Sequence, residues 1–279
     1  MNGAATVIRD TRTRTPFRTQ LVALVRRGLS DDRRGALLWG TGLGIASAFE
    51  VGLFPSIHDS LGTAVAGYPA GIKDAFGITD LGTIEAYLNA EMFSIVLPFA
   101  LAYCAMRSVA NAIAGAEEQG YLDALLAAPV ARRTIVAGAF ATAAITAAVV
   151  LVIDGALTTV GGVIAGDAVR AGNLAAGLAG VWALAMFFAG CATLAAGLVH
   201  RAGQVLGVAA AVLGAMYIFD LVGRLSDAVA PLRWVSAFRY YGAPLQSGLD
   251  VAGFIVLAAA GALLAAAGAW CLERRDVTG

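Results

Sequence analysis

The sequence has few of the residues that most catalytic sites and nucleic-acid-binding surfaces require. Of its 279 residues only 14% are charged, two are histidines, three are cysteines, and Lys73 is the single lysine. A soluble domain has roughly 25% charged residues. Acidic and basic residues balance at 19 each, and we expect no nucleic-acid partner.

Apolar sequence, in contrast, is abundant. Hydrophobic residues make up 59% of the chain, and a membrane-crossing helix needs about 20 mainly apolar residues. Six stretches meet this requirement, near residues 36–54, 92–114, 134–160, 173–199, 204–222 and 251–272. The sequence therefore predicts an all-α integral membrane protein, with one six-span domain over residues 35–279 and a multi-pass location in the cell membrane.

The scarce residue types exclude several chemistries. A Walker A loop, G-x-x-x-x-G-K-[ST], needs a lysine that reaches the phosphates, and Lys73 follows Ile72 instead of a glycine. His58 and His200 are expected at opposite membrane faces, so they build neither a metal site nor a Ser-His dyad. The three cysteines form no C-x-x-C pair, which favours ordinary buried packing. We expect no enzyme activity, metal or cofactor in this chain.

Residues 1–34 form an arginine-rich segment before the first span. No apolar run follows the first basic residues until Ala36, so a cleavable signal peptide is not expected. Phe17, Leu21 and Leu24 recur at helical spacing while arginines point elsewhere, which favours an interfacial helix lying in the headgroup plane after a cytoplasmic tail. A simple polar tail is the alternative.

The arginines also predict the orientation. If six spans alternate, most arginines fall on the side of the N-terminus, and the positive-inside rule makes that side the cytoplasm. Both termini are then cytoplasmic. The arginines expected there, apart from those of the N-terminal segment, are Arg107, Arg132, Arg133, Arg201, Arg274 and Arg275.

The run 117–133, between the second and third spans, has the features of a short cytoplasmic helix. Glu117 and Glu118 open it, and arginines follow its end, as the helix dipole prefers. Leu122, Leu125 and Leu126 share one face if the run is helical. Pro129 gives a stop signal.

This run is similar to a pattern of the ABC-2-type permease family, the membrane subunits of ATP-binding-cassette exporters. The family pattern is acidic-x-Gly-Thr-Leu-acidic-x-Leu-Leu-x-x-Pro-x-x-Arg, and Tyr121 stands where it has Thr. An aromatic segment, 232–241, before the last span and the ending 273–276 also resemble the family. The matching positions in the run are Glu118, Gly120, Leu122, Asp123, Leu125, Leu126, Pro129 and Arg132.

The resemblance implies a division of labour. Two six-span subunits would form the path, and two separate cytoplasmic ATPase subunits would bind ATP and Mg beneath them. The run from Glu117 to Leu126 would be the coupling helix. Small-xxx-small pairs at Gly40/Gly44 and Gly203/Gly207 permit close helix contact in lipid, and the resemblance favours a homodimer through the first and fifth spans. Packing inside one subunit is the alternative.

Two other functions stay open on the sequence. Glu50, Asp154 and Asp220 lie near the outer ends of spans, where an ion-coupled secondary transporter could use them, although none lies clearly at mid-bilayer. A non-transporting membrane scaffold is the other alternative. The substrate is not readable, because spans of Ala, Gly, Val and Leu suit an amphipathic drug, a lipid or a hydrophobic peptide equally.

Overall fold

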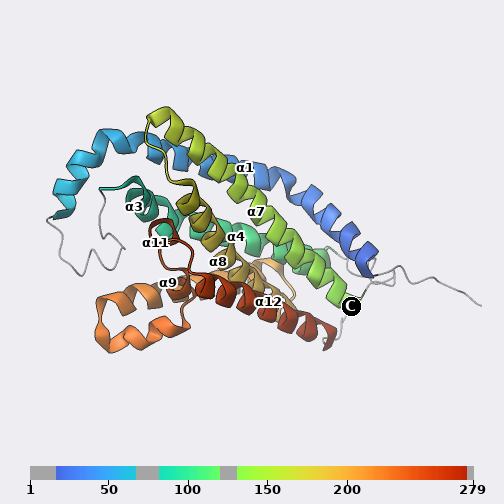
Figure 1. The fold of residues 1–279 in the computed structure, drawn as a ribbon. Helices are drawn as coiled ribbons and strands as arrows, with labels where there is room; N and C mark the ends of the chain where they lie inside the picture. The colour runs from blue at the N-terminus through green and yellow to red at the C-terminus, as the bar shows by residue number, and fades with distance from the viewer. Residues whose placement is uncertain (1–16, 67–81, 120–130, 275–279) are drawn as a thin grey trace, which may run out of the picture.

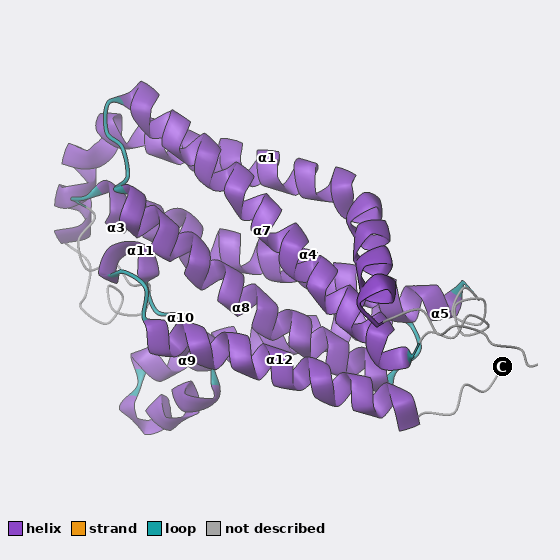
Figure 2. Ribbon diagram, turned by 45° about the vertical axis from the view of Figure 1, so that its right-hand side comes forward, coloured by secondary structure: helices purple, strands orange, loops and turns teal. Residues whose placement is uncertain are grey.

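The computed structural model describes residues 17–66, 82–119 and 131–274, and these residues are helical with short connections (Figures 1 and 2). Six helices are long and apolar enough to cross a membrane, which confirms the predicted fold class. Their long axes run from one end of a bundle to the other, in alternating directions along the chain. The candidate spans are Phe17–Ile57, Ile84–Glu118, Arg132–Ala165, Ala171–Leu198, Ala202–Leu225 and Val251–Arg274.

The first span belongs to one long helix, α1, over Phe17–Ala66. The expected interfacial helix and the first span are therefore continuous, since no proline occurs between Pro16 and Pro55 to interrupt them. Leu24 lies against Gly138, so the N-terminal part of α1 packs on another helix of the bundle. Pro55 lies inside the helix, and the last turns of α1, in light blue in Figure 1, bend away from its main axis, as expected near a helical proline.

The second span is a composite helix. It contains α3 (Ile84–Leu88), the π-helical segment η1 (Asn89–Val96), α4 (Leu97–Ala110), a second π-helical segment η2 (Asn111–Gly115) and α5 (Ala116–Glu118). The Thr83 hydroxyl caps its start by accepting a hydrogen bond from the Ala86 amide, 3.3 Å away. π-helical turns are rare and frequently occur at functional sites.

The remaining elements are α7 (Arg132–Ala165), α8 (Ala171–Leu198), α9 (Ala202–Leu225), the 3₁₀ segment η3 (Asp227–Val235), α10 (Ala237–Tyr241), α11 (Pro244–Ser247) and α12 (Val251–Arg274). Gly166, with φ of 76°, ends α7 in the left-handed region that favours glycine. The Ser236 hydroxyl caps α10 and also donates to the Met216 carbonyl, which fixes α10 against α9.

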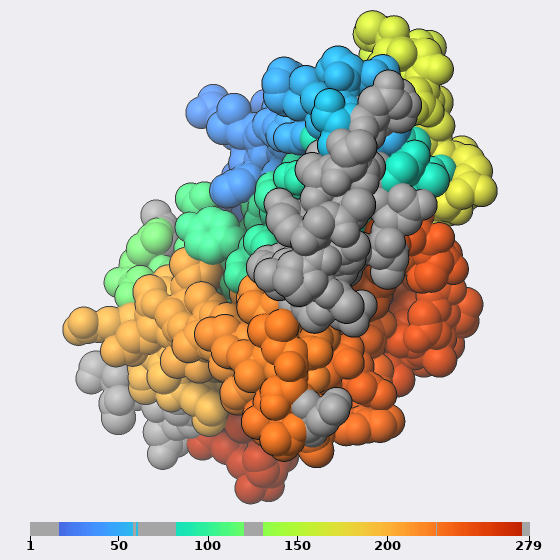
Figure 3. All heavy atoms as spheres, turned by 90° about the vertical axis from the view of Figure 1, so that its left-hand side faces the viewer, coloured from blue at the N-terminus to red at the C-terminus, as the bar shows by residue number. Residues whose placement is uncertain are grey.

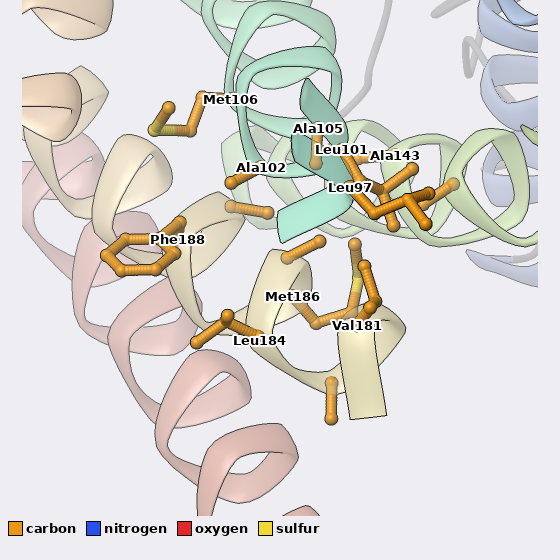
Figure 4. Packing of buried hydrophobic residues seen from close by; sticks show 14 of the residues in the cluster. Leu97, Leu101, Ala102, Ala105, Met106, Ala143, Val181, Leu184, Met186 and Phe188 are labelled. Atoms are coloured by element: carbon orange, nitrogen blue, oxygen red, sulfur yellow. The ribbon is translucent and has the colours of Figure 1, made fainter. Parts of the chain in front are cut away.

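The core lies where α4, α7 and α8 meet. Leu97 and Leu101 of α4 and Leu184 and Phe188 of α8 are fully buried, and Figure 4 shows these side chains pointing into the space between the helices. Around this centre, α1 packs along α7 and α12 packs along α8. The polar connections are thereby left at the two ends of the bundle.

Candidate functional site

The two ends of the bundle differ in their polar groups. We call the end that holds Arg27, Arg132, Arg201 and Arg274 the basic end, and the end that holds Glu85, Arg170, Asp220 and Tyr241 the far end. Figure 3 views the far end, with the blue surface of α1 at the top and the orange surface of α9 to α11 in the lower half.

The predicted coupling run starts and finishes at the basic end. Glu118 is exposed at the end of α5, and the Glu117 carboxylate lies 4.0 Å from the His200 imidazole in the turn between α8 and α9. The Arg132 guanidinium donates a hydrogen bond of 2.7 Å to the Leu272 carbonyl of α12. Both flanks of the run are thus attached to the bundle. The remaining predicted coupling residues lie outside the described residues: Gly120, Leu122, Asp123, Leu125, Leu126 and Pro129.

The predicted dimer glycines divide into two groups. A side chain at Gly40 would meet Ile153, and one at Gly44 would meet Leu157 and Asp154, so this pair is used for packing between α1 and α7. This is the packing inside one subunit that the sequence analysis gave as the alternative to a dimer contact. Gly203 and Gly207 on α9 have no neighbouring atom within 4 Å. Their face of α9 is therefore open in the described part of the chain.

The acidic residues near the outer ends of the spans have different partners. Asp154 is fully buried and accepts a 2.9 Å hydrogen bond from Ser47 through Oδ1, whereas its Oδ2 has no partner among the described residues. Glu50 accepts a 2.5 Å hydrogen bond from the Tyr87 hydroxyl. Asp220 is the one with cationic partners.

Two ion-pair groups hold the far end together. Asp220 accepts hydrogen bonds from Arg224, one turn along α9, and from Arg233 of η3, at 2.8 and 3.0 Å between Nε and carboxylate oxygens. The Arg170 guanidinium donates to the Glu85 carboxylate at 2.9 Å, joining the start of α8 to α3. These pairs neutralise buried acids and fix the helix ends.

Tyr241 connects α10 to the second span. Its hydroxyl donates a 2.7 Å hydrogen bond to the Phe93 carbonyl, and burial raises the pKa of this hydroxyl, so it stays a donor at neutral pH. Phe93 lies in η1, where the shifted hydrogen-bonding pattern leaves carbonyls for other donors.

A cavity of about 190 Å³ lies beside this contact, between η1, α9 and the segment 238–243. Its wall includes Asn89, Glu91, Tyr217, Arg224 and Phe238. Asp220 also lines the cavity and was a candidate residue in the sequence analysis, whereas Phe238 was included there only as part of the aromatic segment 232–241. The sequence did not indicate Asn89, Glu91 or Tyr217. No linear motif joins positions so far apart in the chain, and only the packing of the second span on α9 brings them together.

The described residues hold no group of three or more His, Cys, Asp or Glu side chains that could bind a metal ion. The functional groups of the far end are instead hydrogen-bonding carboxylates, an amide and aromatic rings.

Six apolar helices with polar groups gathered at both ends define a multi-pass membrane protein of the α-helical class. Residues 26–272 match the family described as the C-terminal domain of multidrug efflux system permease Rv1217c, and the chain belongs to this family. The match spans most of all six helices and agrees with the resemblance to ABC-2-type permeases. No curated protein matches the chain. Membership gives it the role of a transport permease.

Proposed function

We propose that this chain is the membrane-spanning permease subunit of an ATP-binding-cassette exporter. It moves amphipathic or hydrophobic molecules out of the cytoplasm, using ATP that a separate subunit hydrolyses. The observation that carries the proposal is the family match over residues 26–272, whose description names a multidrug efflux permease. The missing Walker A loop supports a separate ATPase, because the only lysine does not follow a glycine.

In this proposal the basic end faces the cytoplasm of the cell membrane and receives two ATPase subunits. The run from Glu117 to Leu126 is the coupling helix, and its leucines enter an apolar cleft of the ATPase. Glu117 and Arg132 flank the run on contacts with His200 and Leu272, respectively. A movement imposed on the run would therefore reach α9 and α12 directly.

Leu126→Asp tests the coupling assignment. The change places an unpaired charge in an apolar contact, which costs several kcal/mol, so the permease should reach the membrane in normal amounts but lose its ATPase. Ala124→Asp is the matched control, because position 124 is opposite Leu126 on the predicted helix. The measurements are co-purification with the proposed partner ATPase and ATP-dependent uptake of a fluorescent amphiphile into inverted vesicles.

The same vesicles test the function as a whole. Uptake should require hydrolysable ATP and stop when the Walker lysine of the ATPase is replaced. Uptake that persists without ATP, or a Leu126→Asp complex that transports normally with its ATPase attached, would contradict the proposal.

One observation favours a second candidate, an ion-coupled secondary transporter. Asp154 is a buried acid within a span, with only the neutral Ser47 hydroxyl as its partner in the described part of the chain. Intramembrane acids of this kind often bind a coupling ion. Collapse of uptake by a protonophore at constant ATP would support this candidate.

A further inference from the structure

The far-end cavity contains polar groups that the fold itself does not satisfy. Asn89 is only 3% exposed and lines the cavity, yet its Oδ1 atom has no hydrogen-bond partner among the residues that the structure describes. A buried amide oxygen without a partner destabilises the fold, because its hydrogen bond to water is lost and not replaced. A ligand that donates a hydrogen bond, or carries positive charge, would offset this cost.

The two carboxylates of the wall differ in their charge balance. Asp220 is paired with both Arg224 and Arg233, at 2.6 and 3.0 Å from its oxygens, so this group of three side chains has one positive charge in excess. Because Arg224 is held by Asp220, it is not a free site for an anion. Glu91 is exposed on the wall and has no ion pair with any residue that the structure describes. Its negative charge is left for a ligand.

Aromatic rings form the side of the cavity that faces the bundle. Tyr217 and Phe238 both line it and meet edge to face, with ring centroids 5.3 Å apart. Phe99 supports both rings from behind, 5.2 and 5.9 Å from their centroids. Aromatic faces attract organic cations through the negative charge of the ring face.

The size of the cavity limits the ligand. Its volume of about 190 Å³ is below the roughly 300–1,000 Å³ of sites that enclose a whole drug-sized molecule. A small cationic head group fits, whereas an attached apolar chain must extend out of the cavity. An unpaired carboxylate, an unpaired amide oxygen and aromatic rings together select an ammonium head.

We propose that the far-end cavity binds the positively charged head group of an amphipathic organic ammonium compound. Glu91 supplies the countercharge. The Asn89 amide oxygen faces the cation or accepts a hydrogen bond from it, and the rings of Tyr217 and Phe238 cover the cation. The assignment of this molecule as transported cargo rests on the proposed export function. The cavity would then be the last binding site before release at the far end.

Direct binding to the purified permease tests the site without the ATPase. Isothermal titration of the permease in nanodiscs with hexyltrimethylammonium should show saturable binding that hexanol and hexyl sulfate do not show. Glu91→Gln should weaken the cation about 10-fold, the equivalent of losing 1.4 kcal/mol. Asn89→Asp should increase the affinity for the cation, because a second carboxylate replaces the amide oxygen. Unfolding would lower the affinity in both variants, so a loss at position 91 with a gain at position 89 excludes it.

Asp167→Asn is the matched control, since Asp167 lies at the same end after α7 but does not line the cavity. It should leave the affinity unchanged. Cation binding no tighter than hexanol binding, or equal losses in Glu91→Gln and Asp167→Asn, would overturn the site. Absence of ATP-dependent export with cation binding intact would overturn the proposed function alone.

Discussion

At the scale of single residues, the buried and partly buried acids of the bundle have three kinds of partner. Asp220 and Glu85 are paired with arginines, Glu50 has a tyrosine hydroxyl, and Asp154 has only the Ser47 hydroxyl. Removing the acid from a buried ion pair leaves uncompensated cations, which is costly. Removing the charge of Asp154 leaves no cation behind, because none is paired with it in the described part of the chain. The consequences of neutralising these acids should therefore differ.

Asp154→Asn should change the stability of the permease by less than about 0.5 kcal/mol, since an amide keeps the shape and can still accept from Ser47. Asp220→Asn should cost about 3–5 kcal/mol, because Arg224 and Arg233 lose their carboxylate. Thermal unfolding of the two purified variants, followed by size-exclusion chromatography, measures the difference. Under the export proposal, ATP-dependent uptake by Asp154→Asn matches that of the wild type. Lost uptake with unchanged stability would favour ion coupling instead.

At the scale of elements, glycines set the distance between α8 and α12. A side chain at Gly261 would lie 2.5 Å from the Met186 carbonyl oxygen, and one at Gly197 would lie 2.6 Å from the Gly268 carbonyl oxygen. The obstacles are backbone atoms, which cannot rotate away as a side chain could. The two helices therefore pack at close range over several turns, as small residues permit in lipid.

Gly268→Ala should accordingly destabilise the permease by about 1–3 kcal/mol, the usual cost of overpacking. A methyl group there would approach the Thr193 carbonyl carbon to 2.7 Å. Gly214→Ala on α9 is the control, because nothing lies within 4 Å of that position and alanine favours the helix. Thermal unfolding midpoints that fall equally in both variants would refute this account of the α8–α12 contact.

The elements also separate what the sequence predicts from what it does not. The six spans are predictable because each is a long apolar run, and long apolar runs have one structure in lipid. The continuity of α1 was not predicted. The charged residues at 31–34 suggested a boundary between the interfacial helix and the first span, but charged side chains do not interrupt a helical backbone. The use of Gly40 against α7 and the pairing of Glu85 with Arg170 depend on which helices are neighbours. Local sequence contains no information on that choice.

At the scale of the whole molecule, the distribution of arginines predicts how the bundle is oriented in the membrane. The basic end holds the start of α1, the turn between α8 and α9 and the end of α12, so one orientation in the membrane puts all of them in the cytoplasm. The export proposal requires this orientation, because ATP is available only on that side. The far-end cavity then opens to the outside.

Cysteine labelling in intact cells tests the orientation. Cys104, Cys191 and Cys271 are partly exposed, so they are first replaced by alanine. A membrane-impermeant maleimide should label Ser226→Cys, which is exposed at the far end, but not Gly120→Cys until the cells are opened. External labelling at position 120 would contradict both the orientation and the coupling assignment.

The open face of α9 indicates where a second copy of the chain would bind. Among the six spans α9 is the least buried inside the chain, and Gly203, Gly207 and Gly214 have no neighbouring atom within 4 Å. Because Gly40 and Gly44 already contact α7, they are not free for a partner. We therefore expect the proposed homodimer to use the glycine face of α9, while any contribution from α1 must come from residues other than this pair.

Crosslinking across α9 provides the test. In the background without native cysteines, Gly207→Cys and Gly203→Cys should each give a covalent dimer on mild oxidation of native membranes, because they are one turn apart on the same face. Gly172→Cys is equally open but lies at the start of α8, and it should remain monomeric. Gly207→Phe should lower the dimer fraction without lowering the unfolding temperature, since position 207 is exposed and a Cβ atom there meets nothing within 4 Å in the described part of the chain. Monomers alone at both α9 positions would exclude this face as the contact, and equal crosslinking at position 172 would show that collisions, rather than a specific interface, produce the dimer.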